Sequence, residues 1–155
     1  MIKYNTIVFI DEDNTGLSPF AAGLFKKKLR ETGSTISTYS KGTAVLFPEP
    51  VNPRIAELAK ARGVFLENHS AAALQEEDYA DDTLILTMDS ISRNRVYATC
   101  AGPANIFMLK EYMGENGELR LPIGEGIEKY EAVCTAIDRL LDGLIQKIKE
   151  EDILI

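Results

Sequence analysis

The most informative stretch of the chain is Val8-Phe9-Ile10-Asp11-Glu12-Asp13-Asn14-Thr15-Gly16-Leu17-Ser18-Pro19. It reads as an apolar strand, a tight polar loop and the start of a helix. This is the build of a phosphate-binding loop, in which backbone N–H groups and a helix N-terminus collect an anion. The loop carries three acids and no base, however, so its geometry favours phosphate while its charge repels it.

The composition limits the class of protein. The chain has 155 residues, which predicts a single domain over residues 1–155, and a formal net charge of −7. Nucleic acid and anionic membrane surfaces need basic protein surface, so we expect neither as a partner. No apolar run approaches the roughly 20 residues that cross a bilayer, and the first residues lack a signal-peptide pattern. Cys100 and Cys134 lack metal-ligand spacing, which predicts a reduced, cytoplasmic protein.

Strand and helix patterns alternate on both sides of the opening stretch. They predict strands at residues 6–10, 35–39, 83–88 and 106–109, and helices at residues 19–30, 52–62, 90–100 and from 127 onward. Ser18 is the expected N-cap of the first helix, with Pro19 at its first position. The alternation predicts an α/β protein with a parallel sheet covered on both faces. Ligands of such sheets bind beyond the carboxyl ends of the strands, where the loop after Ile10 lies.

Several short motifs together resemble the low-molecular-weight protein tyrosine phosphatase family. The family has a strand, then Cys-x-Gly-Asn-x-Cys-Arg-Ser-Pro, then a helix. The matching segments occur in the family's order and span nearly the whole chain: Asp11–Pro19, Ser40–Thr43, Pro53–Gly63, Asn68–Ala71, Asp82–Asp89 and Leu121–Gly124. The resemblance implies a Rossmann-like three-layer α/β/α sandwich, the phosphotyrosine protein phosphatase I fold. Its sheet would have four parallel strands in the order 2-1-3-4, with about five helices around it.

The resemblance also implies a two-step phosphoryl transfer that this chain lacks the residues to perform. In the family the first Cys attacks phosphorus, the Arg binds the phosphoryl oxygens, and an Asp protonates the leaving oxygen. By position, Asp11 replaces the nucleophile, Leu17 the Arg and Leu121 the general acid. Nucleophile, charge clamp and proton donor are therefore missing together.

Magnitudes support a loss of phosphate binding. Hydrogen bonds from Arg to phosphate are charge-assisted and contribute roughly 1.5–3 kcal/mol each. A carboxylate ~4 Å from one unit of phosphate charge costs ~4 kcal/mol at an effective dielectric constant of 20. Replacing Arg by Leu17 while adding Asp11 and Asp13 is therefore expected to abolish micromolar phosphate binding near neutral pH.

Other family positions are kept. The resemblance assigns the support of the loop to Asn14, Ser18, Ser40 and His69. Asn tolerates the left-handed backbone that such a loop needs. The candidate pocket, formed by Asp11, Glu12, Asp13, Asn14, Thr15, Gly16, Leu17 and Ser18, thus keeps the scaffold of the loop and discards its chemistry.

A second interpretation makes the chain an enzyme. A strand followed by Asp-x-Asp-x-Thr, here Asp11 to Thr15, is similar to the first motif of haloacid-dehalogenase-type phosphatases. Asp11 would then be the nucleophile and Asp13 the acid/base, and both would hold Mg²⁺. This chemistry also needs a later Ser or Thr, a Lys and an acidic pair; Thr87 is available for the first and Asp81-Asp82 for the last. A simple cation site on the loop acids, or three solvated acids near a positive helix end, are further alternatives.

The leading hypothesis is a catalytically degenerate phosphatase homologue that acts as a binding or regulatory module. Its partner is an unknown protein or small molecule, with a basic peptide among the candidates, because the acidic pocket favours neutral or cationic groups. No cofactor is expected, except Mg²⁺ under the alternative. A family phosphatase with its loop elsewhere is disfavoured, since neither Cys100 nor Cys134 is followed six residues later by Arg.

Overall fold

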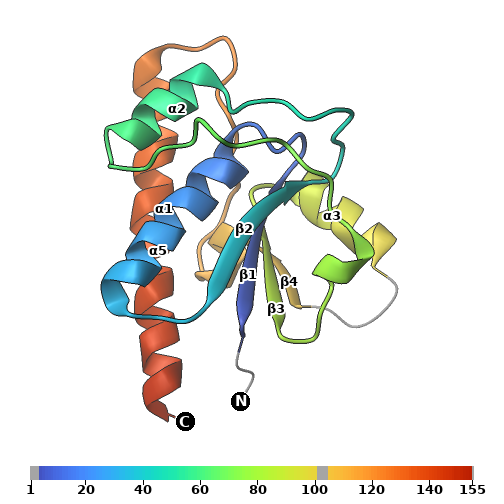
Figure 1. The fold of residues 1–155 in the computed structure, drawn as a ribbon, viewed down its shortest axis with the longest axis vertical. Helices are drawn as coiled ribbons and strands as arrows, with labels where there is room; N and C mark the ends of the chain where they lie inside the picture. Colours follow the sequence, from blue (N-terminus) through green and yellow to red (C-terminus); the bar gives the residue numbers. More distant parts are fainter. Residues whose placement is uncertain (1–3, 101–104, 155) are drawn as a thin grey trace.

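The protein is described here from a computed structural model that covers residues 4–100 and 105–154 (Figure 1). Strands and helices alternate along these residues, as the sequence patterns predict. In chain order the elements are β1 (Thr6–Asp11), α1 (Leu17–Thr32), β2 (Ser37–Gly42), α2 (Pro53–Lys60), the short 3₁₀ helix η1 (Glu76–Asp78), β3 (Thr83–Thr87), α3 (Ser90–Thr99), β4 (Asn105–Met108), α4 (Leu109–Tyr112) and α5 (Ile127–Leu154).

The four strands form one parallel sheet in the order β2-β1-β3-β4. This confirms the expected fold class and strand order. The register aligns Asp11 with Gly42, and Ile10 with Thr87. The carboxyl ends of the central strands therefore meet at one edge of the sheet, and the loop after β1 leaves from that edge.

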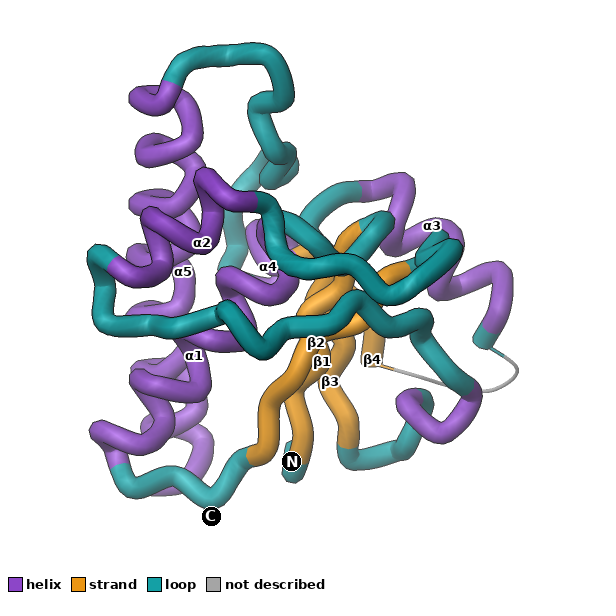
Figure 2. The backbone as a smooth tube through the Cα atoms, turned by 45° about the horizontal axis from the view of Figure 1, so that its top comes forward, coloured by secondary structure: helices purple, strands orange, loops and turns teal. Residues whose placement is uncertain are grey.

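The helices form two unequal layers on the sheet (Figure 2). Successive side chains of a strand point to opposite faces. Ile7 and Phe9 of β1 join a large core cluster with α1, α2 and α5, whereas Val8 and Ile10 join a smaller cluster with α3. All four side chains are fully buried, as expected for a central strand covered on both faces.

The last helix follows the predicted apolar periodicity. The buried face of α5 consists of Tyr130, Cys134, Ile137, Leu140, Leu141 and Leu144. Burial raises the pKa of the Cys134 thiol to about 11, which suits a packing residue rather than a reactive one. Ile127, at the start of the pattern, is half exposed.

Element boundaries depart from the sequence prediction at several places. The strand predicted at residues 35–39 runs over Ser37–Gly42, because it pairs with β1 along the whole length of β1. The helix predicted at residues 52–62 ends at Lys60, although its predicted cap is correct: Asn52 accepts from the amides of Arg54 and Ile55. The strand predicted at residues 106–109 is Asn105–Met108.

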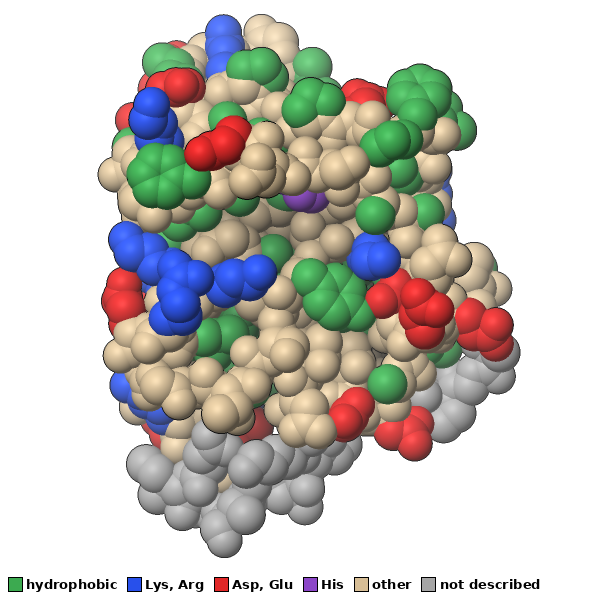
Figure 3. Space-filling model, viewed as in Figure 1, with side chains coloured by type: hydrophobic (Ala, Val, Ile, Leu, Met, Phe, Trp, Pro, Cys, Tyr) green, Lys and Arg blue, Asp and Glu red, His purple; other side chains and the backbone are tan. Residues whose placement is uncertain are grey.

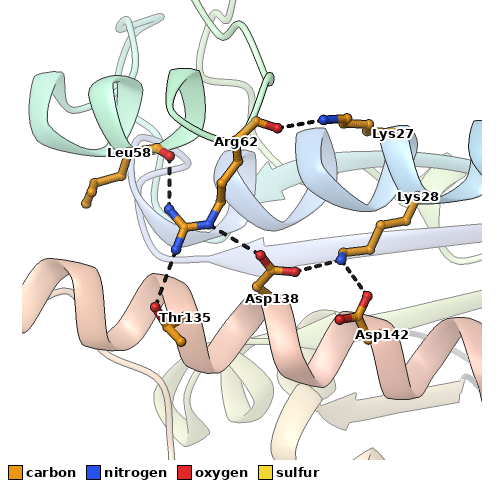
Figure 4. Close-up of polar contacts among 7 residues, drawn as sticks. All are labelled: Lys27, Lys28, Leu58, Arg62, Thr135, Asp138 and Asp142. Carbon is orange, nitrogen blue, oxygen red and sulfur yellow. Dashed lines mark hydrogen bonds and ion pairs between the residues drawn. The ribbon is translucent and has the colours of Figure 1, made fainter.

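A polar cluster ties α1 to α5 and to the end of α2 (Figure 4). Lys28 Nζ lies 2.6 Å from Asp138 and 2.5 Å from Asp142, and the Arg62 guanidinium lies 3.4 Å from Asp138. Lys27 donates to the carbonyl oxygen of Arg62 at 2.7 Å. We call these five residues the α1–α5 clamp. The basic run that begins at Lys26 is therefore partly engaged inside the molecule.

Within residues 4–100 and 105–154, no helix combines the length and the hydropathy needed to cross a membrane.

Candidate functional site

The loop between β1 and α1 is a sharp turn built around Asn14. Asn14 has φ = 61°, a left-handed backbone conformation that Asn adopts more readily than most residues. The helix begins at Leu17, so Ser18 lies inside its first turn and is not the N-cap, and Pro19 is its third residue. The prediction of Ser18 as N-cap is wrong because the amide of Ser18 already donates to an acceptor outside the helix, the carboxylate of Asp11.

The side chain of Asn14 is the centre of the loop support. It is fully buried, and its amide nitrogen donates to the hydroxyls of Ser18 and Ser40, both at 2.9 Å. Its side-chain oxygen accepts from the amide of Ala72 at 3.0 Å. His69 Nε2 lies 2.6 Å from the backbone oxygen of Asn14. The structure thus brings together the four residues assigned to loop support and adds the Ala72 amide, which no side-chain pattern in the sequence indicates.

The end of β2 approaches the loop closely. A Cβ atom at Gly42 would lie 2.8 Å from the backbone oxygen of Glu12 and 3.0 Å from Cβ of Asn14. The next two amides donate into the loop: Thr43 N to the oxygen of Asp11, and Ala44 N to that of Glu12. Gly42 of the Ser-Lys-Gly-Thr segment therefore has a structural role, because the lack of a side chain allows the backbone of β2 to pack directly against the loop.

Asp11 points into the centre of the loop. Its two carboxylate oxygens accept from the amides of Asn14 at 2.7 Å and of Ser18 at 2.9 Å. Burial raises the pKa of this carboxyl group; hydrogen bonds from Ser18 and Asn14 oppose the rise, and the charge of Asp13 adds to it. Asp11 therefore caps the N-terminus of α1, although it lies seven residues before Ser18 in the chain.

The other two loop acids have local partners. Asp13 accepts from the amide and the hydroxyl of Thr15, at 3.0 Å and 2.8 Å. Glu12 is exposed and lies 3.7 Å from Arg95 on α3. Of the three acids, only Asp11 is enclosed by the loop.

The two other positions that the resemblance aligns with functional residues of the family, Leu17 and Leu121, are apolar and packed. Leu17 is 3% exposed and belongs to the large core cluster. Leu121 packs against the same cluster, and its side chain lies 3.2 Å from where a Cβ atom on Gly16 would be. The positions that would hold a charged clamp and a proton donor therefore contribute to packing.

The arrangement of acids does not suit the Mg²⁺-dependent alternative. Both oxygens of Asp11 already accept backbone amides. The pair Asp81-Asp82 precedes β3, at the sheet edge opposite to Asp11, because Thr83 aligns with Thr6. The length of β1 separates this pair from Asp11, and that length is roughly 15 Å at about 3.3 Å per residue. Among the residues that the structure describes, no group of three or more His, Cys, Asp or Glu side chains is placed to hold a metal ion.

Two surface cavities flank β2. One of about 270 Å³ lies beside α1 and is lined by the loop-support residues Ser40 and His69 together with Lys26 and Phe65. The other, of about 810 Å³, lies on the α3 side and includes Thr43 and Arg95 in its lining. In Figure 3, Lys and Arg side chains gather over α1 at the left, and Asp and Glu side chains over the η1 region at the right.

Comparisons with known proteins show which sequences and folds this chain is similar to. The chain is 28% identical over 148 residues to the protein-arginine-phosphatase of Bacillus subtilis (strain 168), covering 94% of this chain and 97% of that protein. It is 31% identical over 124 residues to the low molecular weight protein-tyrosine-phosphatase PtpB of Staphylococcus haemolyticus (strain JCSC1435), covering 80% and 86%. The crystal structure of a low molecular weight protein tyrosine phosphatase from T. tengcongensis matches with a TM-score of 0.85 and 29% identity, covering 92% of this chain and 98% of that one.

The sequence profile of the low molecular weight phosphotyrosine protein phosphatase family matches residues 6–153. The match includes the loop, the end of β2 and the whole parallel sheet. Membership in this family calls for no cofactor. The chain belongs to the low molecular weight phosphotyrosine protein phosphatase family.

Proposed function

We propose that this chain is a non-catalytic member of the family that acts as a binding or regulatory module. The proposal is supported by the contacts that the side chains make at the three substituted positions. Asp11 is bound to backbone amides, Leu17 is in the core, and Leu121 packs against Gly16. Thiolate attack, charge clamping of the phosphoryl group and protonation of the leaving oxygen each lack their residue.

We further propose that the loop end of the molecule binds a neutral or cationic group of a protein or small-molecule partner. The loops at the carboxyl edge of the sheet expose the acids Glu12, Asp13, Glu49 and Glu125. Basic side chains reach this end as well: Arg95 lies 3.7 Å from Glu12, and Arg54 donates to the backbone oxygen of Glu125. Exposed Leu46 and Phe47 lie on the loop between β2 and α2, and a partner with apolar side chains beside basic ones complements this composition.

The relatives suggest where to look for the partner. Their names describe phosphatases that act on arginine or tyrosine in proteins. A protein segment that presents an unphosphorylated basic side chain is the corresponding ligand for an acidic loop. The expected location is the cytoplasm, on the composition argument given above.

Turnover is tested with p-nitrophenyl phosphate, with and without Mg²⁺, from pH 4 to 9, beside the Bacillus subtilis relative as the active control. We expect no turnover above background. Turnover without metal contradicts the proposal directly. Metal-dependent turnover that disappears in Asp11→Asn establishes the phosphohydrolase alternative instead.

Binding is tested by titrating the ¹⁵N-labelled protein separately with arginine amide and with inorganic phosphate. We expect saturable shifts of the loop amides with arginine amide and none with phosphate at equal ionic strength. Saturable shifts of the loop amides with phosphate, together with no shifts with arginine amide, would contradict the proposed ligand preference. Glu12→Gln with Asp13→Asn is the matched variant, and it is expected to weaken the arginine amide response while leaving the fold intact.

A further inference from the structure

The Asp11 carboxylate occupies a definite place in the loop. It sits at the end of β1, and its two oxygens reach different parts of the turn: Oδ1 accepts from Asn14 N at 2.7 Å and Oδ2 from Ser18 N at 2.9 Å. The residue before α1 is Gly16, which offers no side-chain cap. Asp11 therefore supplies the negative charge at the N-terminus of a 16-residue helix.

These amides are the groups that a loop of this type offers to an external anion. A third amide, that of Thr15, donates to Asp13 at 3.0 Å. Hydrogen bonds that already serve the chain's own carboxylates are not available to phosphate or sulfate. The carboxyl group of Asp11 also fills the volume between the two donors it bridges.

We propose that Asp11 is the resident anion of this loop and the residue that determines its specificity, excluding oxyanions by occupying their site rather than only by repelling them. This inference rests on the proposed non-catalytic function, because a catalytic loop would have to leave the site open. It goes further, since it states how phosphate is excluded and which atoms do it.

Occupation and repulsion make different predictions for two substitutions. Asp11→Ala removes the charge and empties the site. Asp11→Asn removes the charge and keeps the site filled, because the amide is the same size as the carboxyl group. If repulsion alone excludes anions, both variants bind them equally; if occupation excludes them, only Asp11→Ala does.

The test uses formate, which is the group that Asp11→Ala lacks. We expect formate to shift the amide signals of Asn14 and Ser18 saturably in Asp11→Ala and to raise the melting temperature of that variant. Wild type and Asp11→Asn are expected to bind formate about tenfold more weakly or not at all. In the wild type both donors are engaged, and in Asp11→Asn the side chain still fills the site although only its oxygen can accept an amide. Asp13→Ala is the matched control and should remain unresponsive. Acetate with Asp11→Gly repeats the size match, because acetate is the side chain that Asp11→Gly lacks.

Two outcomes overturn the inference. Equal formate binding by Asp11→Asn and Asp11→Ala shows that repulsion suffices. No binding by a folded Asp11→Ala shows that the amides form no anion site. If Asp11→Ala does not fold, an NMR pH titration of the wild type replaces it. The amide protons of Asn14 and Ser18 must then show the same titration midpoint as the carboxyl carbon of Asp11. Different midpoints overturn the inference. Turnover by the wild type would overturn the proposed function and this inference with it, whereas the formate outcomes overturn the inference alone, so the two failures are distinguishable.

Discussion

Two polar networks hold α1 in place, and they are built in opposite ways. The loop network at its N-terminal end consists of Asn14 and Ser18, which are buried, and of Ser40 and His69, which are half-buried, and none of its hydrogen bonds is an ion pair. The α1–α5 clamp on its outer face consists of ion pairs, and the side chains of Lys28, Asp138 and Asp142 are 16%, 32% and 69% exposed. The clamp contains more charges, and its two Lys28 contacts are shorter than the hydrogen bonds of the Asn14 side chain, yet physical chemistry assigns the larger stabilisation to the loop network.

This difference indicates which of the two networks fixes the geometry of the turn between β1 and α1. A buried polar group that loses its partner keeps its full desolvation penalty, whereas an exposed ion pair is replaced by water and salt at little cost. The loop network therefore dictates one geometry for the turn, while the clamp adds only a modest attraction. The loop network therefore accounts for the defined shape of the turn between β1 and α1.

The strongest test of the comparison is Asn14→Ala. It removes three side-chain hydrogen bonds and places a Cβ-bearing residue without local support at φ = 61°. We expect a loss of about 3–4 kcal/mol in the free energy of unfolding, measured by urea denaturation. Asn14→Gly, which relieves the backbone strain alone, should recover about 1 kcal/mol of this loss. A cost of Asn14→Ala no larger than that of a clamp variant breaks the comparison.

Gly42→Ala tests whether the approach of β2 supports the network. The new Cβ meets the backbone oxygen of Glu12, which has no flexible way to yield. We expect a loss of about 1–3 kcal/mol by the same assay. Gly33→Ala is the control, because Gly33 has φ = 72° and open space around its Cβ position, so its cost reports strain alone. Because Gly42 has no positive φ, the absence of any loss in Gly42→Ala would show that the close contact contributes nothing.

The pH dependence of stability distinguishes a carboxyl group whose pKa is set mainly by burial, Asp11, from one whose pKa is set mainly by hydrogen bonds, Glu118. The native pKa of Asp11 is raised, so the folded state binds its proton more tightly than the unfolded state does. Relative to Asp11→Asn, the wild type should therefore lose stability as pH rises from the ordinary aspartate pKa of about 3.9 through the raised native value.

Glu118 behaves in the opposite sense. Hydrogen bonds from Ser90, followed by one from Arg120, lower the pKa of Glu118 to about 2. Its contribution relative to Glu118→Gln should be complete above pH of about 4.3 and disappear as pH falls through about 2. Urea denaturation between pH 2 and 8 measures both carboxylates. Parallel pH profiles for the two variants would contradict the signs assigned here.

The smallest effect is expected in the clamp. Lys28→Met removes both ion pairs to α5 and keeps most of the apolar stem. We expect a loss of about 0.5–1 kcal/mol at low ionic strength that shrinks in 1 M NaCl. Lys26→Met, on the same helix and exposed, is the control. A loss of several kcal/mol that does not shrink in 1 M NaCl would mean that the clamp stabilises the protein as much as the loop network does.

Local sequence patterns predicted most of the fold. The alternation of strands and helices, the long apolar face of α5, and the Asn52 cap of α2 are consequences of residue spacing, and the structure has them. Strand ends were less accurate, because β2 extends to Gly42 only through its pairing with β1. The strand order came from the resemblance of the motifs to a family, since no local pattern orders strands in a sheet.

The sequence by itself determined that the loop keeps an Asn suited to a left-handed turn and carries acids where a phosphate-binding loop needs bases. Only the tertiary structure decided what each of those acids does. Asp11 caps the helix in place of Ser18, Asp13 binds its own neighbour, and Glu12 faces α3. The physical reason is that a backbone amide donates to whichever acceptor the folded chain brings nearest. At this loop that acceptor is placed by the turn at Asn14, which the residue type favours, and by the approach of β2, which residue spacing along the chain does not encode.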